Sequence, residues 1–526
     1  MNNNLVCRYP GRHPFISLYT AVLILLSSGC TMLGPDFAKP DVPEPGDWLQ
    51  EQEQEQTFQN TSFDSREWWK VFNDPALDSL VDTAYRQNLS LQVAGLRILE
   101  ARAQLGIATG LQYPQQQSVG GSAQAVGVSE NSPNFFSGFA DTSFKDYQLG
   151  FDAAWELDFW GRYRRGIESA ESNLSATVAD YDNALVSLTA EVARVYVTIR
   201  TLQERLAIAL NNIKLQEESL RIADVRFRNG ATTELDVQQA KSNLADTQAQ
   251  VPALQRSLRQ AMNGLSILLG MPPANLTNML GETGSIPVAP TQVAVGIPAE
   301  LLRRRPDVRS AEMLASSQSA LIGVAETDLY PRFGLLGSIG YQTSNTGSSS
   351  SSDLFDSDSL GYSVGPSFTW NILNYGRIRN NVRVEDSRYQ QTLVNYQDTV
   401  IKAYQEVEDA MIGFIKSQEE TVFRANAATA SKRSTEIANI QYREGAVDFQ
   451  RVIDTERALV LNQDRWTSSR GDIVLNLVAM YKALGGGWEI REGHDFISEQ
   501  NRSEMQERTN WGDLLDSSDE EGEVVE

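Results

Sequence analysis

Histidine, cysteine and positive charge are scarce in this 526-residue chain, and each shortage excludes a class of function. Only two histidines occur, and His13 lies in a predicted targeting segment, which argues against a histidine-based metal or acid–base site. The net charge of -23 offers no basic groove to phosphates, so we expect no nucleic-acid partner. The chain also lacks a glycine-rich phosphate-binding loop, and its acidic residues lie on repetitive helical faces. An enzyme with paired carboxylates is therefore a weak alternative, and we expect no catalytic or metal-binding residues.

Both cysteines lie near the N-terminus. Residues 1–29 combine basic residues with a short apolar run, which is typical of a secretory signal. Small residues at 27–29 directly before Cys30 resemble the bacterial lipoprotein processing site, although the usual large aliphatic residue is displaced by one position. This resemblance implies a covalent lipid on Cys30, with ordinary cleavage and a free thiol as the alternative. Because Cys7 would leave with the signal, we expect no internal disulfide.

Two stretches change from strand to helix periodicity at a glycine. Residues 151–159 alternate apolar and polar side chains before Gly161, and residues 362–372 do so before Gly376. Paired landmarks recur at offsets of 215 or 217 residues, which indicates duplication, with a first repeat at 61–275 and a second at 276–488. The landmark pairs are Tyr113-Pro114 with Tyr330-Pro331, Gly161-Arg162 with Gly376-Arg377, Gly230 with Gly445, and Leu269-Gly270 with Leu484-Gly485.

Each half is predicted to run helix, strand, strand, long helix, turn, helix. In the first half we expect one helix over 75–111, a strand over 117–128 and a loop over 131–146. The second half repeats the first strand at 333–341. The proline-free helix from Arg162 to Asn229 should reach roughly 100 Å. Apolar residues spaced by three and four over 185–213 and 400–414 predict coiled-coil seams.

Four strands in one chain cannot close a membrane barrel, because small barrels need about eight and open edges are not tolerated in lipid. Copies of the chain must therefore pool their strands, which leaves eight strands from two copies or twelve from three. A soluble sheet buried on one face is the alternative. In the barrel, Asp152, Glu156 and Asp158 should face water. The aromatic belt facing lipid should comprise Trp155, Phe159, Trp160, Phe368, Trp370 and Tyr375.

Several motifs resemble those of the TolC-like outer-membrane efflux proteins, closest to their lipoprotein branch (OprM/NodT-like). They are Gly34-Pro35-Asp36-Phe37, the run from Trp68 to Leu77, the run from Leu301 to Arg309, and Ala483 to Trp488. The resemblance implies an α+β fold in which three copies build a twelve-stranded β-barrel on a long α-helical coiled-coil tunnel in the periplasm. It also implies a passive outer-membrane exit duct that exports small molecules such as drugs. A periplasmic adaptor and an inner-membrane pump of the RND type would be its partners. The alternative is a lipid-anchored coiled-coil structural protein or adhesin without a pore.

Helix–glycine–helix turns end the long helices, and simple capping is part of their role. The resemblance implies that these turns dock the adaptor at Arg228, Asn229, Gly230, Leu235, Asp236, Glu444, Gly445 and Phe449. It also implies a gate at Asp454, nine residues after the second glycine, with Gln450 and Arg451 beside it. Polar Gln450 departs from the apolar residue of the family. An exposed helix acid without a gate role is the alternative for Asp454.

Two segments flank the repeats. Residues 30–60 are rich in proline, glutamine and glutamate and are predicted to form an extended tether behind the lipid anchor. Residues 489–526 are acidic and are predicted to form a disordered tail.

Overall fold

Two compact units make up the computed structural model, which describes residues 31–42, 48–49, 58–59, 65–129, 131, 142–281, 284–290, 293–294, 304–346 and 349–515. Unit 1 comprises Met1–Ala38, Ala103–Asn173 and Leu314–Thr392, and unit 2 comprises Lys39–Arg102, Leu174–Met313 and Leu393–Glu526. The predicted signal and Cys30 lie outside the described residues. Within those residues, no helix combines the length and apolar character needed to cross a membrane.

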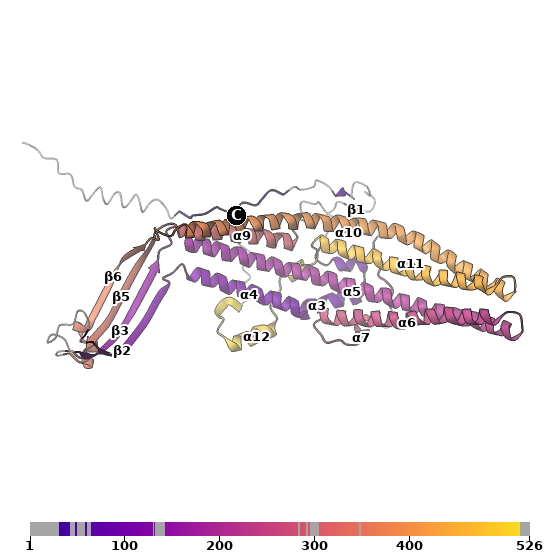
Figure 1. Ribbon diagram of the computed structural model, residues 1–526, viewed down its shortest axis with the longest axis horizontal. Coiled ribbons are helices and arrows are strands. Elements are labelled where there is room, and N and C mark those ends of the chain that lie inside the picture. The colour runs from indigo at the N-terminus through magenta and orange to yellow at the C-terminus, as the bar shows by residue number, and fades with distance from the viewer. Residues whose placement is uncertain are drawn as a thin grey trace, which may run out of the picture. The chain divides into compact units, whose positions relative to one another are not determined.

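An antiparallel sheet of four strands, seen in Figure 1, belongs to unit 1. Its strands, in spatial order, are β2 (Gln116–Gly127), β3 (Ser143–Glu156), β5 (Arg332–Ser344) and β6 (Leu360–Thr369). The predicted loop over 131–146 is wrong at its end, because β3 starts at Ser143, which pairs with Gly127. The last predicted strand is too long: β6 ends at Thr369, which pairs with Arg332, the first residue of β5. The strand periodicity itself is confirmed.

The helices occur in pairs of equal length. α4 (Leu89–Gly110) and α9 (Pro306–Thr327) have 22 residues each, and α5 (Arg162–Arg228) and α10 (Arg377–Arg443) have 67 each. The returning helices α6 (Glu234–Leu268) and α11 (Phe449–Ala483) have 35 each. These equal lengths confirm the duplication. The smaller elements are β1 (Phe58–Gln59), η1 (Trp68–Phe72), α7 (Thr277–Leu280), β4 (Val293–Ala294), η2 (Ser351–Phe355), η3 (Ser357–Ser359), η4 (Glu489–Arg491), α12 (Glu499–Arg508) and η5 (Gly512–Leu515).

The single helix predicted over 75–111 is wrong, because the chain breaks at Asn88 between α3 (Pro75–Gln87) and α4. Asn88 has an extended backbone, and its side chain accepts a hydrogen bond from the Leu91 amide at 2.9 Å. The same side chain donates to the Leu268 carbonyl at 2.9 Å. Asn88 thus caps α4 and also satisfies a carbonyl at the end of α6.

The predicted helical seams are buried in unit 2. Leu185, Val192 and Ile199 of α5 are fully buried, as are Val400 and Phe414 of α10. The core of unit 2 also holds the motif that begins at Trp68: Asp74 caps α3 by accepting the Ala76 amide at 3.1 Å, and it also accepts the Tyr196 hydroxyl at 2.5 Å. These contacts give the run from Trp68 to Leu77 a structural role.

Arg305, from the run Leu301 to Arg309 named in the sequence analysis, is 7% exposed. Its guanidinium donates to the Ala483 carbonyl at the end of α11 at 2.7 Å, and it pairs with Asp307 and Glu406, each at 2.7 Å. The cost of burying this charge is therefore offset by a hydrogen bond to a carbonyl and by ion pairs with two carboxylates.

The start of the predicted tether is held against α5. Arg165 donates to the carbonyls of Leu33 and Gly34 at 3.0 and 3.2 Å and pairs with Asp36 at 2.7 Å, so this part of the tether is fixed on α5. Gly34 has a φ of +85, and a Cβ there would lie 2.4 Å from the Gly323 Cα. Glycine is therefore required at this close approach of two backbones.

The segment after Trp488 packs against unit 2 as far as Leu515. Ile497, Met505 and Leu515 form a buried cluster with Leu99 of α4. Arg491 pairs with Asp182, whose side chain is fully buried. The predicted disorder is thus wrong for 489–515. Apolar residues spaced among the acidic ones form a buried face, which the net charge of the segment did not indicate.

Candidate functional sites

The two faces of the unit 1 sheet differ in chemistry. One row across the four strands is apolar: Val119, Phe151, Ile339 and Tyr362 pair in register, and all are at least 41% exposed. The neighbouring row on the opposite face is polar and consists of Ser118, Asp152, Ser338 and Ser363. An apolar face this open must be covered by lipid or protein, whereas the other face suits water.

Glycine occupies a whole row of the polar face. Gly120, Gly150, Gly340 and Gly361 pair in register, one from each strand. A Cβ added to Gly340 would lie 2.7 Å from the Gly150 Cα, so no side chain fits there, whereas a Cβ at Gly120 would meet nothing within 4 Å. The row opens space on the polar face and permits the sheet to curve.

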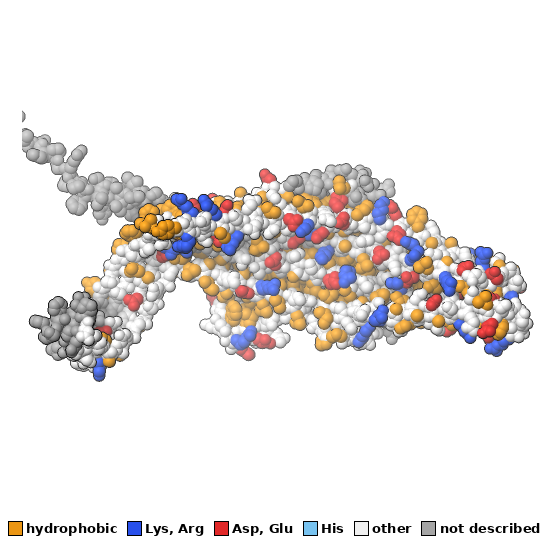
Figure 2. Space-filling view, in the orientation of Figure 1, with side chains coloured by type: hydrophobic (Ala, Val, Ile, Leu, Met, Phe, Trp, Pro, Cys, Tyr) orange, Lys and Arg blue, Asp and Glu red, His pale blue; other side chains and the backbone are white. Residues whose placement is uncertain are grey.

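The predicted aromatic belt residues gather where strands meet helices, and Figure 2 shows hydrophobic side chains at that end of the sheet. The indole N–H groups of three of them bond to backbone carbonyls: Trp155 to Gln112 at 3.2 Å, Trp160 to Pro331 at 2.8 Å and Trp370 to Leu329 at 3.0 Å. Trp155, Phe159 and Trp160 are half-buried, whereas Phe368, Trp370 and Tyr375 are exposed. The tryptophans therefore hold the helix-to-strand turns as well as presenting rings to the exterior.

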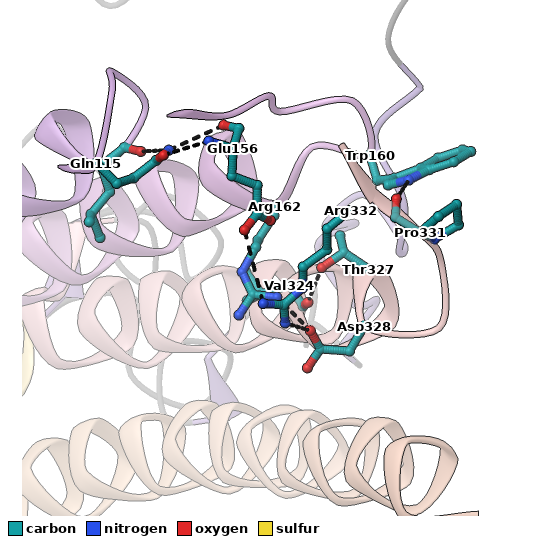
Figure 3. Close-up of polar contacts among 10 residues, drawn as sticks. Gln115, Glu156, Trp160, Arg162, Val324, Thr327, Asp328, Pro331 and Arg332 are labelled. Atoms are coloured by element: carbon teal, nitrogen blue, oxygen red, sulfur yellow. Dashed lines mark hydrogen bonds and ion pairs between the residues drawn. The ribbon is translucent and has the colours of Figure 1, made fainter. Parts of the chain in front are cut away.

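An ion cluster lies at the same junction, as Figure 3 shows. Asp328 accepts from Arg162 at 2.5 Å and from Arg332, and Arg332 lies 4.0 Å from Glu156. Burial favours a higher pKa for Asp328, but the two arginines outweigh it and hold that pKa below its usual value. The sequence analysis missed Asp328: Arg332 is only four residues away, but Arg162 lies 166 residues away along the chain.

The predicted pore lining is wrong at Asp158, which lies at the same junction. Asp158 accepts the amides of Tyr163 and Arg164 at 3.1 and 3.0 Å, so it caps α5, and its side chain is only 9% exposed. Glu156 faces the ion cluster. Of the three predicted acids, Asp152 lies in the polar row and Glu156 lies on the same face at the end of β3, whereas Asp158 lies beyond the strand and caps α5.

The two hairpin turns, α5–α6 and α10–α11, close at the same end of unit 2, and Figure 2 shows charges of both signs there. Gly230 and Gly445 take φ values of +68 and +78, which allow the chain to reverse. Asp448 caps α11 by accepting the Arg451 amide at 3.2 Å. Thr233 stands at the same position of α6 but makes no side-chain cap bond.

The predicted docking residues divide into two groups. Six are exposed at the turns: Arg228, Asn229, Gly230, Leu235, Glu444 and Gly445. Phe449 is only 1% exposed and packs on Tyr442, with ring centroids 5.0 Å apart. Asp236 accepts hydrogen bonds from Thr232 and, at 3.4 Å, from the Tyr442 hydroxyl. Phe449 and Asp236 therefore support the turns from within.

Another contact, which the sequence analysis missed, joins the two hairpins. Arg226 of α5 donates to the Tyr442 carbonyl of α10, and its guanidinium lies 4.7 Å from the centroid of the Tyr442 ring. The hairpins are thus held together close to their turns by a charge-assisted hydrogen bond and a cation–π contact.

The predicted gate residues are exposed on α11. Gln450 donates to the Asp454 carboxylate at 2.8 Å and accepts from Gln239 of α6 at 3.3 Å. Within the described chain, Arg451 forms no ion pair with Asp454. Gln450 therefore ties the predicted gate acid to the other hairpin.

Glu456, two residues beyond Asp454, is 2% exposed. It accepts from Ser219 of α5 at 2.5 Å and from Asn243 of α6 at 3.0 Å. Burial raises the pKa of Glu456 to about 7, against the opposing effect of hydrogen bonds from Ser219, Asn439 and Asn243. The sequence analysis missed this site, although its position in the stripe of Val452, Ile453 and Leu459 was a usable signal.

Comparisons with known proteins agree with this architecture. A family model described as outer membrane efflux protein matches residues 80–271 and 297–486. The chain is 30% identical over 481 residues to outer membrane protein OprJ of Pseudomonas aeruginosa, covering 91% of this chain and 97% of that protein. It is 27% identical over 474 residues to cation efflux system protein CusC of Escherichia coli, covering 88% and 97%. The solved outer-membrane channel OprN matches with a TM-score of 0.80 and 33% identity, covering 87% of this chain and 100% of that one.

Proposed function

This chain belongs to the outer membrane efflux protein family, and on that premise we propose how its residues serve export. The protein is an outer-membrane duct of an efflux system and works with an adaptor and an inner-membrane pump. Its family consists of channels. Our proposal concerns the assembly, the pore surface, the anchor and the docking sites.

Three copies of the chain form a twelve-stranded barrel, with the row of Phe151 and Ile339 facing lipid and the row of Asp152 facing water. The observation that carries this proposal is the four-stranded sheet of two opposite faces, whose outer strands β2 and β6 have no second partner in the described chain. Twelve strands leave no open edge and enclose a lumen.

Planar bilayers test the duct directly. Purified trimer should insert and give discrete single-channel conductance. A trimer that inserts without conducting would favour the alternative, a lipid-anchored coiled-coil spacer or adhesin.

The six exposed turn residues from Arg228 to Gly445 form the adaptor docking surface in this proposal. They are exposed, whereas Phe449 and Asp236 hold the turns behind them. A photo-crosslinking amino acid at Asn229 or Glu444 should capture a periplasmic adaptor in cells, and the same probe at Glu171 of α5 should not. Equal capture at all three positions would contradict docking at the turns. The captured adaptor would then identify its pump, which we propose to be of the RND type, and the class of small molecule exported.

A lipid on Cys30 anchors the N-terminus in the proposed assembly. Metabolic labelling with palmitate should mark the mature protein, and Cys30→Ser should abolish the label while Cys7→Ser leaves it unchanged. Label that persists in Cys30→Ser would contradict this anchor.

A further inference from the structure

A cavity of about 510 Å³ lies among three helices of unit 2, with α6 and α11 on its sides and α5 beneath them. All of its lining residues belong to unit 2 of one chain. We propose that this cavity binds a small zwitterionic amphiphile, a molecule that carries a carboxylate, a protonated amine and an apolar body. The inference goes beyond the proposed function, because conduction through a duct requires no bound ligand.

Gln216 of α5 is the buried polar side chain of this cavity. It is only 2% exposed, yet its Oε1 atom has no hydrogen-bond partner among the residues that the structure describes. A buried acceptor without a donor is costly to the fold. Because Gln216 lines the cavity, a ligand that donates an N–H group there would supply the missing hydrogen bond.

The second repeat shows how the same position is closed when no ligand is needed. α10 and α11 each start 215 residues after α5 and α6, so Gln216 and Thr247 correspond to Ser431 and Asn462. Asn462 donates to the Ser431 hydroxyl at 2.6 Å. In the first repeat, Thr247 donates instead to the carbonyl of its own helix at Asn243, at 3.3 Å. The open acceptor is therefore a departure of the first repeat from the second.

Arg457 of α11 presents an unpaired positive charge to the same cavity. Its Nε donates to the Asn243 side chain at 3.3 Å, and Asn243 is itself buried and donates to Glu456 at 3.0 Å. Within the described part of the chain, Arg457 forms no ion pair. The terminal nitrogens of its guanidinium can therefore bind a ligand carboxylate with two parallel hydrogen bonds.

A negative charge lines the cavity as well. Asp246 of α6 is exposed there and, among the described residues, has no cationic partner. A ligand with a single charge would leave either Asp246 or Arg457 unmatched, whereas a zwitterion pairs with both.

The rest of the lining suits an apolar body. Arg205 and Asp464 are joined by hydrogen bonds of 2.7 and 3.1 Å, so this pair adds no net charge. Leu254 and Leu461 contribute apolar surface. The volume also lies in the range of about 300–1,000 Å³ that is usual for small-molecule sites.

Two fluorescent probes that differ by one group test the site. Nε-dansyl-lysine carries a carboxylate, an ammonium group and an apolar fluorophore, and dansylcadaverine is the same molecule without the carboxylate. Full-length protein in lipid nanodiscs should bind dansyl-lysine about tenfold more tightly, because only this probe makes the charge-assisted bonds to Arg457. Empty nanodiscs give the background. Equal affinities for the two probes would overturn the proposal.

Arg457→Gln should remove the preference for dansyl-lysine and leave the affinity for dansylcadaverine unchanged. The matched control is Arg465→Gln, because Arg465 is an exposed arginine of the same helix that does not line the cavity. This control should keep the preference. A preference that survives in Arg457→Gln, or is lost equally in the control, would overturn the assignment of the carboxylate to Arg457.

Gln216→Leu separates binding from folding. Because the variant removes a buried oxygen that has no partner, the unliganded protein should melt at the same temperature or a higher one, while its affinity for dansyl-lysine falls. A photo-crosslinking amino acid at Gln250, an exposed residue of the lining, should capture no adaptor in cells. Undiminished affinity in Gln216→Leu, or capture of an adaptor at Gln250, would overturn the small-molecule site.

Discussion

The Glu456→Gln variant should lose the pH dependence with which α5, α6, α10 and α11 pack near the hairpin turns. In the packed state the pKa of Glu456 rises from its ordinary value of 4.5 to about 7, chiefly through burial. Packing therefore favours the protonated acid. The contribution of protonated Glu456 to the stability of this packing is fully present below about pH 4.5. It is lost as the pH rises through about 7, where the buried carboxyl ionises.

The raised pKa means that the packed state is about 3 kcal/mol less stable when Glu456 is ionised than when it is protonated. Glutamine keeps the shape and hydrogen-bonding capacity of the protonated acid, so the variant should keep the packing of low pH at all pH values. Hydrogen exchange of peptides spanning 449–460, corrected for the intrinsic effect of pH, measures the opening. Protection of the original protein should fall between pH 5 and 8, and that of Glu456→Gln should stay level.

Glu444→Gln is the matched control, because Glu444 is exposed at the adjoining turn. It should retain the fall in protection with pH. If Glu456→Gln followed the same pH curve as the original protein, titration of the buried carboxyl would not govern this packing.

Three further predictions concern the sheet, the junction and the gate. Gly340→Ala should reduce trimer yield and thermal stability, because its Cβ would lie 2.7 Å from the facing glycine Cα, whereas Gly120→Ala should be tolerated; equal yields would refute the steric argument. Asp328→Asn should lower the melting temperature at neutral pH but have a smaller effect near pH 3. Because the pKa of Asp328 is lowered, the ion cluster stabilises the fold above the usual carboxyl pKa, and this stabilisation is lost as the pH falls. A decrease in melting temperature that is independent of pH would point to packing instead. Asp454→Ala should raise single-channel conductance and weaken block by multivalent cations, and unchanged conductance and block would remove Asp454 from the gate.

Local patterns predicted the elements that repeat or alternate. Strand alternation placed the apolar face, the shared offsets revealed the duplication, and Gly230 and Gly445 marked the two turns because a reversal after a long helix needs a positive φ. These features depend on near neighbours in the chain, so a single sequence contains them.

Features that depend on distant partners were lost or misplaced. Asp158 is a local exception: it looked like a pore acid because strand alternation continues to it, but it caps α5 through amides only five and six residues away. Asn88 interrupts a helical pattern because it also bonds to Leu268, 180 residues away. The acidic segment after Trp488 looked disordered by charge, yet Met505 and Leu515 bury against α4. Composition alone does not indicate which face of a charged segment will pack against the rest of the protein.

The central claim is that the polar face of the sheet lines a conducting pore. The most direct measurement compares Asp152→Cys with Phe151→Cys, adjacent residues on opposite faces of β3, in planar bilayers. A bulky, charged, water-soluble thiol reagent should reduce the conductance of Asp152→Cys channels and leave Phe151→Cys channels unchanged. Block of Phe151→Cys with no effect on Asp152→Cys would contradict the account.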